Sequence, residues 1–114
     1  MSDSYDDRFS GISRLYGSSG TAALRSAHIA VIGIGGVGSW SAEALVRTGI
    51  GEITLVDLDE VCISNTNRQI HALTQTVGQS KVRVMAERLG AVNPDCSLNA
   101  EEYFFTEKTL RAVL

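Results

Sequence analysis

A glycine-rich turn is the part of this sequence best suited to chemistry, because it can hold a phosphate group. Residues 30–38 read AVIGIGGVG, an apolar run that breaks into Gly33-x-Gly35-x-x-Gly38. The first glycine permits a tight turn, the second a close backbone approach to phosphates, and the third close packing of helix on strand. The start of the following helix offers free N–H groups and a positive dipole end to an anion. The turn therefore predicts a nucleotide site, but it leaves NAD, FAD and ATP open.

Charged and polar side chains beyond the turn favour ATP. Asp57 follows the turn by about 20 residues, where this fold places the carboxylate that binds ribose hydroxyls. A triphosphate needs more cationic help than a dinucleotide, and Arg68 and Lys81 supply positive charge. Asp59 can reach Mg²⁺, which prefers one or two carboxylates plus phosphate oxygens, and Asn65 can bind ribose or phosphate. Each residue also has an ordinary reading as a turn, helix or surface residue, but together they favour ATP.

Alternating strands and helices must position these side chains. We expect strands at 28–33, 52–57 and 97–104, and helices at 37–48, 80–92 and 106–114. The first two strands are short and β-branched, as in strands buried on both faces. This βαβαβα order predicts an α/β fold, a Rossmann-like parallel sheet with right-handed crossovers. Residues 1–20 are interpreted as an N-terminal arm outside the core, and residues 21–114 as the nucleotide-binding part.

The apolar periodicity of each helix predicts which side chains face the core. The expected core positions are Val37, Trp40, Ala44 and Leu45 in the first helix, and Val82, Met85, Leu89 and Val92 in the second. Cys62, within a Val-Cys-Ile run, is interpreted as buried packing, and His71 as a structural residue. The connection 58–78 is too long for an ordinary loop, which suggests a function in it.

The strand order also predicts that these residues form the front half of a doubly wound domain. Such a domain places its first strand in the middle of the sheet, with the fourth strand beside it. This chain ends before a fourth strand, so the apolar edge of the first strand would be unpaired. We expect either a longer domain or another chain to cover that edge.

Composition limits the remaining classes. The net charge is −3 and the ten basic residues are scattered, so no basic stripe suggests nucleic-acid binding. No apolar run approaches the ~18 residues of a membrane span, and the first residues lack a signal-peptide core. We therefore predict a cytoplasmic protein without membrane contact. Cys62 and Cys96 form no CxxC pair, so neither a zinc site nor a disulfide framework is indicated.

Three segments resemble the E1-like ATP-dependent activating enzymes, the ThiF/MoeB/HesA superfamily. They are GIGGVGSW from Gly33, LVDLDEVCISNTNRQ from Leu55, and VGQSK from Val77. VRTGIG at 46–51 and ISNTNRQIHAL at 63–73 look most like the bacterial tRNA threonylcarbamoyladenosine dehydratase branch. Sulfur-carrier adenylyltransferases usually carry Leu at the position of Thr66. The resemblance runs from about Arg8 to Pro94.

The resemblance implies an enzyme that binds ATP and Mg²⁺ and transfers AMP to a carboxylate, releasing pyrophosphate. In the dehydratase branch the carboxylate belongs to a threonylcarbamoyl group on a tRNA adenosine, which then cyclises with net loss of water. The positions carried over are Gly33, Gly35, Gly36 and Gly38 around the phosphates, Asp57 at the ribose, and Asn65, Arg68 and Lys81 at the phosphates. Among these, Arg68 and Lys81 would stabilise charge at the α-phosphate.

The resemblance further implies a homodimer in which an N-terminal arginine reaches the partner's ATP. Arg14 is our candidate and Arg8 the alternative. The implied partners are tRNA and a cysteine desulfurase or sulfur-acceptor system. The family's magnesium-binding aspartate would lie beyond residue 114, so we expect these residues alone to be inactive. Three alternatives stay open: adenylation of a ubiquitin-like sulfur carrier, an NAD- or FAD-dependent oxidoreductase, and a non-catalytic nucleotide-binding or dimerisation module.

Overall fold

A parallel sheet forms the centre of the computed structural model, which describes residues 4–113. Within these residues three strands lie in the order β1 (His28–Ile32), β2 (Glu52–Val56) and β3 (Ser97–Glu101). The register sets His28 opposite Glu52, and Glu52 opposite Ser97. The predicted Rossmann-like α/β architecture is confirmed. All three strands are parallel, so their carboxyl ends meet at one edge, where ligands bind in such sheets.

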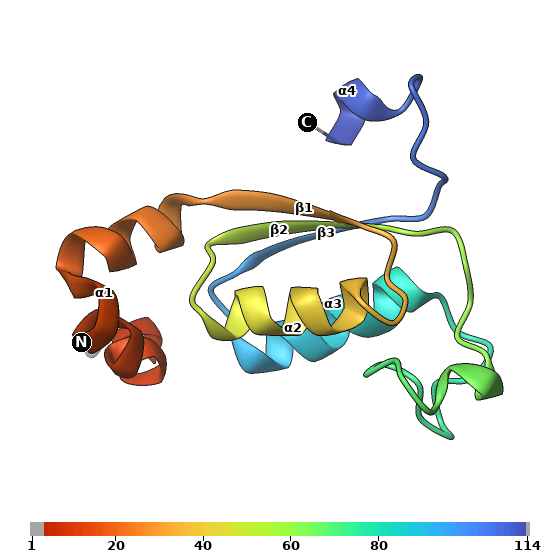
Figure 1. Ribbon diagram of the computed structural model, residues 1–114, viewed down its shortest axis with the longest axis horizontal. Helices are drawn as coiled ribbons and strands as arrows, with labels where there is room; N and C mark the ends of the chain where they lie inside the picture. The colour runs from red at the N-terminus through yellow and green to blue at the C-terminus, as the bar shows by residue number, and fades with distance from the viewer. Residues whose placement is uncertain (1–3, 114) are drawn as a thin grey trace.

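Two helices, α2 (Gly38–Arg47) and α3 (Lys81–Val92), cover one face of the sheet (Figure 1). Their apolar side chains pack on β2 in a single core that includes Ile53, Leu55, Met85 and Leu89. The α3 face predicted from periodicity is confirmed, with Val82 buried beside them. The hydroxyl of Ser80 accepts a hydrogen bond from Arg83 N and caps the start of this helix.

The predicted core face of α2 is wrong. Its buried residues are Ser39, Ala42, Glu43 and Val46. Val37 is 82% exposed and Trp40 is 52% exposed, although both were expected in the core. The buried face was missed because it carries a serine and a glutamate, which break the apolar periodicity. Leu45 is half-buried against the core, and Ala44 is exposed.

The N-terminal residues form a kinked helix, α1 (Ser4–Ser26), with breaks at Phe9 and Gly17. The expectation that residues 1–20 stay out of the core is wrong for Tyr5 and Phe9, which are 1% and 4% exposed. The Tyr5 hydroxyl donates to Gly49 O at 2.6 Å, which fixes the start of α1 beside the end of α2. The division of the chain into an arm and a nucleotide-binding part at residue 20 stays a prediction. Residues 1–3 of that arm lie outside the described residues.

The connection after β2 contains one short 3-10 helix, η1 (Ile63–Asn65), within the described residues. An isolated antiparallel β-bridge between Glu60 and Ser80 brings the two ends of this connection together at the start of α3. The last strand and helix are shorter than expected, because β3 ends at Glu101 and α4 spans Leu110–Val113. The expected helix end at residue 114 lies outside the described residues.

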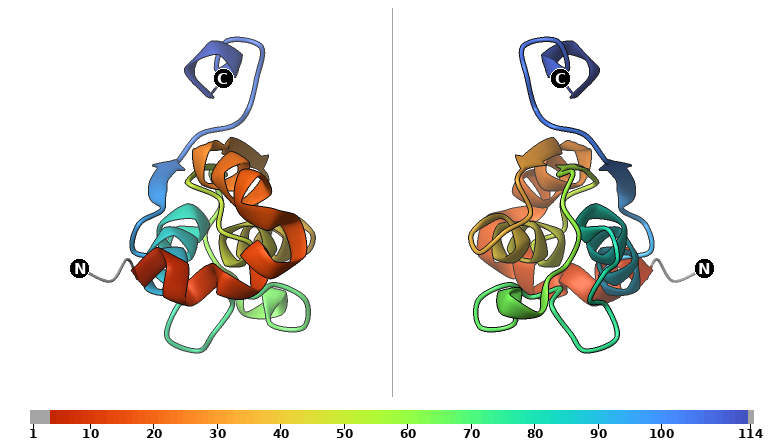
Figure 2. Two further views of the ribbon diagram at one scale, coloured as in Figure 1. Left: turned by 90° about the vertical axis from the view of Figure 1, so that its left-hand side faces the viewer. Right: turned by 90° about the vertical axis from the view of Figure 1, so that its right-hand side faces the viewer.

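The other face of the sheet is left open by α2 and α3 (Figure 2). Among residues 4–113, β1 is an edge strand that pairs only with β2, and its end residues His28 and Ile32 are exposed rather than buried. Polar side chains cross this face, since Asn99 donates to Thr54 and Glu52, and the Thr54 hydroxyl lies 2.6 Å from His28 Nε2. Among the described residues, no helix is long and apolar enough to cross a bilayer.

Candidate nucleotide site

The glycine turn lies at the carboxyl end of β1 and leads directly into α2 (Figure 1). Gly33 has a φ of 86°, which favours glycine, and its N–H donates to Val56 O on the neighbouring strand at 2.8 Å. A Cβ on Gly38 would lie 1.7 Å from Gly33 O, so the turn folds onto itself at a distance only glycine permits. By contrast, Gly35 and Gly36 have room for a Cβ.

The backbone of Ile34 is held on both sides. Its N–H donates to Asp57 Oδ2 at 2.7 Å, and its carbonyl lies 2.8 Å from His71 Nε2. A carbonyl only accepts, so His71 carries its proton on Nε2. The Ile34 side chain is fully buried in the core. The middle of the turn is therefore fixed by a carboxylate, an imidazole and apolar packing at once.

Burial lowers the pKa of His71, and the positive charge of Lys81 acts in the same direction. The contact with Ile34 O and the charge of Asp57 oppose this shift without cancelling it. His71 is thus neutral at physiological pH, in keeping with its interpretation as a structural residue. Its contact explains why a histidine follows the Arg68 segment.

Asp57 stands at the end of β2 and binds two backbone N–H groups. Besides Ile34, it accepts from Asp59 N at 2.8 Å through its Oδ1 atom. Each carboxylate oxygen offers two lone pairs, so both retain capacity for a ribose hydroxyl. The predicted ribose ligand thus also shapes the glycine turn.

Arg68 lies against the glycine turn. The position of a Cβ on Gly36 would be 3.6 Å from Arg68 Cγ. Its guanidinium donates to Ser64 O at 3.1 Å and to Asn67 Oδ1 at 3.0 Å. The indole of Trp40 donates to Arg68 O at 2.8 Å. Trp40 therefore holds the backbone of Arg68 rather than packing in the core as we expected, and nothing in its local sequence indicates this contact.

The segment after Arg68 contributes a buried amide. Gln69 is 6% exposed, and its Nε2 lies 3.9 Å from a Cβ position on Gly35. Its Oε1 has no hydrogen-bond partner among residues 4–113. An unpaired buried polar atom beside a glycine turn is a place where a ligand group can bind.

Asp59, Asn65 and Lys81 line one cavity of about 600 Å³, together with Leu58, Glu60 and Cys62. Asn65 Oδ1 accepts from Cys62 N at 2.8 Å, which fixes the start of η1. Lys81 is 7% exposed, and its N–H donates to Asp59 O at 3.1 Å. Three of the predicted site residues are thus brought together. The expectation of a buried Cys62 is wrong, because its side chain is exposed at this cavity.

Asp57 itself lines a second cavity, of about 220 Å³. Its lining comprises Ile32, Gly33, Val56, Asp57, Leu58, Tyr103, Phe104 and Phe105. The aromatic residues were missed by the sequence analysis. Their signal was present, because they follow a parallel strand and such residues meet at the carboxyl edge of the sheet.

The arginine expected to act on a partner's ATP lies far from this chain's own turn. Arg14 belongs to α1, which Figure 1 shows at the opposite end of the sheet from the glycine turn. Arg8 donates to Val92 O at the end of α3, whereas Lys81 stands at the start of that helix. Neither arginine therefore serves the turn of its own chain. Their action on a partner's nucleotide stays a prediction.

A family model describes most of this chain, since the ThiF family matches residues 8–114. The chain belongs to the ThiF family. The matched range contains the glycine turn, both cavities and the residues that line them. The superfamily expected from GIGGVGSW and the segments after it is confirmed.

Curated relatives in this family include tRNA threonylcarbamoyladenosine dehydratases. The chain is 56% identical over 106 residues to that of Escherichia coli, which covers 93% of this chain and 40% of the relative. It is 52% identical over 93 residues to that of Bacillus subtilis. A ubiquitin-like modifier-activating enzyme 5 from Bombyx mori is 43% identical over 83 residues. The chain spans about 40% of the length of the dehydratases it matches.

Solved structures give the same result. The E. coli dehydratase in complex with ATP has a TM-score of 0.94 and 53% identity, covering 97% of this chain and 46% of that one. The same enzyme with AMP has a TM-score of 0.95. An E. coli MccB structure has a TM-score of 0.84 at 29% identity.

Proposed function

We propose that this chain provides the ATP-binding part of an enzyme that adenylates the threonylcarbamoyl carboxylate of a modified tRNA adenosine. The observation that carries the proposal is the 56% identity to a tRNA threonylcarbamoyladenosine dehydratase across the whole glycine-turn region. A neighbour at TM-score 0.94 was solved with ATP, which supports ATP as the nucleotide. The relatives that carry the name dehydratase are longer than this chain, and the dehydratase activity of the whole protein is part of this proposal.

In the proposed reaction a carboxylate oxygen attacks the α-phosphorus of ATP, and the bond to the β-phosphate breaks. Pyrophosphate leaves, and the carboxylate becomes an acyl-adenylate. A nucleophile of the same threonylcarbamoyl group then attacks the acyl carbon and expels AMP, which carries away the carboxylate oxygen. The product is a ring with one water fewer. A carboxylate is already nucleophilic, so no enzyme base is required for the first step.

The residues of this chain have distinct parts in that reaction. The N–H groups at the start of α2 and the turn around Gly35 and Gly36 bind the phosphates. Arg68 and Lys81 stabilise the charge that builds on the α-phosphate and the leaving group. Asp57 binds the ribose. The aromatic cavity of Tyr103 to Phe105 fits the flat adenine ring, because aromatic side chains stack on bases.

Mg²⁺ fits this arrangement as an ion that protein and phosphate oxygens would bind together. Within residues 4–113, no three His, Cys, Asp or Glu side chains converge on a metal position. Asp59 offers one carboxylate in the cavity of Asn65 and Lys81, and Mg²⁺ binds through one or two carboxylates plus phosphate oxygens. The ion would neutralise phosphate charge and orient the leaving pyrophosphate. Homodimer formation, the role of Arg14 in the partner's site, a sulfur-transfer partner and a cytoplasmic location belong to the same proposal.

Pyrophosphate exchange tests the proposal. The full-length protein should return labelled pyrophosphate into ATP when tRNA carrying threonylcarbamoyladenosine is supplied, and not when a ubiquitin-like carrier is supplied. Exchange that occurs with the ubiquitin-like carrier and not with the tRNA would show that the substrate is a carrier protein instead of a tRNA. Tighter binding of NADH than of ATP with Mg²⁺ would reject adenylation altogether.

Arg68→Ala is the matching variant. It should lower exchange at least tenfold, or ~1.4 kcal/mol of transition-state stabilisation, because it removes a cation from the phosphates. Its thermal unfolding should change little, since the Arg68 side chain is exposed. Arg111→Ala, on the exposed face of α4, is the matched control and should exchange normally. Unchanged exchange in Arg68→Ala would remove this residue from the site.

A further inference from the structure

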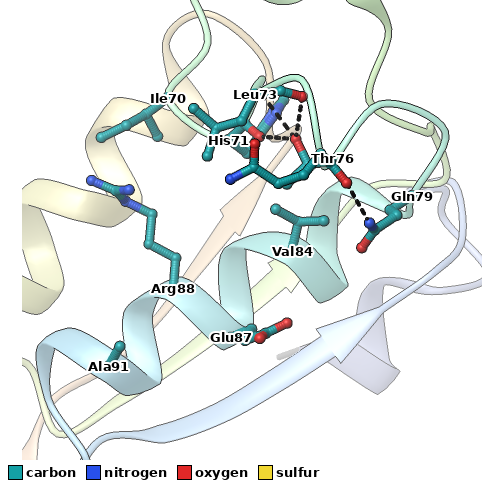
Figure 3. Close-up of a pocket in the computed structure, with 10 residues that line it drawn as sticks. Ile70, His71, Leu73, Thr76, Gln79, Val84, Glu87, Arg88 and Ala91 are labelled. Carbon is teal, nitrogen blue, oxygen red and sulfur yellow. Dashed lines mark hydrogen bonds between the residues drawn. The ribbon is translucent and has the colours of Figure 1, made fainter.

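Three arginines that are far apart in the sequence meet at one cavity away from the nucleotide site. Arg8 of α1, Arg47 of α2 and Arg88 of α3 line about 370 Å³ together with Ala91 and Val92. We call Arg8, Arg47 and Arg88 the arginine cluster. Figure 3 shows Arg88 reaching from α3 toward α2, while the neighbouring Glu87 points away. The scattered basic residues of the sequence thus form a local patch that the net charge of −3 conceals.

One carboxylate organises the arginine cluster. Glu43, 5% exposed, accepts from Arg88 Nε at 2.9 Å and from Arg88 Nη2 at 3.1 Å. It also accepts from Arg47 Nε at 2.8 Å. Burial would raise the pKa of Glu43, but the hydrogen bonds and charges of the two arginines outweigh it and lower the pKa below the usual 4.5. Glu43 is therefore charged at neutral pH.

The arginine cluster holds more positive charge than Glu43 needs. Arg88 alone makes a two-bond pair with this carboxylate, which is a strong geometry for a buried charge. Arg47 and Arg8 are then in excess. The Arg47 side chain is 57% exposed and contacts Glu43 through its Nε at 2.8 Å. Arg8 donates one bond to Val92 O at 3.2 Å. Hydrogen bonds to Glu43 and to Val92 O thus bring the three arginines to one cavity.

We propose that the arginine cluster binds the phosphodiester backbone of the tRNA. This inference rests on the proposed function, because that function supplies the polyanion. Guanidinium forks match phosphate oxygens, and such contacts position a nucleic acid without reading its sequence. The described domain is 40 Å along its longest axis, and an RNA helix of that length presents a phosphate every few ångströms. An RNA that contacts the arginine cluster while its modified base enters the nucleotide site has to bridge a distance of this order.

The test is the salt dependence of tRNA binding by the full-length protein. Arg47→Gln keeps the Arg88–Glu43 pair and should lower the slope of log K against log salt by about 1, with weaker binding at low salt. Arg8→Gln combined with Arg47→Gln should lower it by about 2. The matched control is Arg83→Gln combined with Arg111→Gln, which makes the same charge change on exposed surface elsewhere. Thermal unfolding of every variant shows whether the fold is retained.

Each outcome decides the proposal. A reduced slope in Arg47→Gln, with a slope in the control like that of the unchanged protein, supports it. Equal slopes in the double variant of Arg8 and Arg47 and in the matched double control would overturn it, while the proposed adenylation stands. If the unchanged protein does not bind tRNA but shows pyrophosphate exchange with a carrier protein, both the arginine-cluster proposal and the tRNA substrate fail.

Discussion

At the scale of single residues, Ile34 shows how the site is fixed in place. Its N–H donates to Asp57 and its carbonyl accepts from His71. Two side chains from distant segments therefore fix the two peptide groups that flank Ile34. Asp57 could be found from its spacing alone. The role of His71 could not, because its partner is a backbone atom 37 positions away.

His71 gives the stability of the fold a pH dependence. Its pKa in the folded protein lies below the usual 6.5, so the unfolded chain binds the proton more readily. The contribution of His71 is therefore complete above about pH 6.5 and is lost as the pH falls toward the lowered pKa. We expect urea midpoints to fall between about pH 7.5 and about pH 5.5, and to fall less in His71→Gln. Parallel curves for the two proteins would contradict this.

At the scale of elements, the glycine turn separates folding from binding. Gly38→Ala places a Cβ against Gly33 O, a backbone atom that cannot move aside, and should cost about 3 kcal/mol or more. Gly35→Ala and Gly36→Ala meet only ordinary contacts and should change the unfolding free energy by about 0.5 kcal/mol or less. Their methyl groups instead obstruct the phosphates, so ATP affinity should fall on the order of tenfold. Denaturant titration and calorimetric ATP binding measure the two effects.

The buried glutamate of α2 joins this helix to α3. Glu43→Gln removes the charge that faces Arg47 and Arg88, and we expect a loss of about 3 kcal/mol at neutral pH. The lowered pKa of Glu43 means that its stabilisation is present above 4.5 and is lost as the pH falls through the lowered value. The difference in unfolding free energy between Glu43→Gln and the unchanged protein should therefore shrink only in strong acid. A difference that is constant with pH would show that packing, not charge, is responsible.

These elements also show what the sequence can reveal. The strands, α3 and the spacing of the glycine turn follow local patterns, and the structure confirms them. The buried face of α2 does not, because Glu43 is stabilised by Arg88, 45 residues later. Tyr5 and Phe9 likewise are buried through contacts with Gly49, the second residue after α2. Apolar periodicity is a property of a single segment, so it does not indicate contacts with residues far away in the sequence.

At the scale of the whole molecule, the edge of β1 makes association the expected behaviour of residues 1–114 on their own. The strand has unpaired backbone groups, and Ile32 is 44% exposed beside it. Light scattering should show an average mass that rises with concentration. Ile32→Lys should reduce this rise, because a charge at an edge opposes pairing. Leu15→Lys, at an exposed position of α1 away from the sheet, is the control. A monomer at all concentrations would contradict the expectation.

The anchoring of Ile34 has a further consequence for the energetics of ligand capture. A turn already held at its amide, its carbonyl and its side chain loses little conformational entropy when a nucleotide arrives. Binding energy is then not spent on ordering the chain, and association does not wait for a rare conformation. In the proposed nucleotide site the turn acts as a rigid receptor, and we expect selectivity among nucleotides to come from the residues around it.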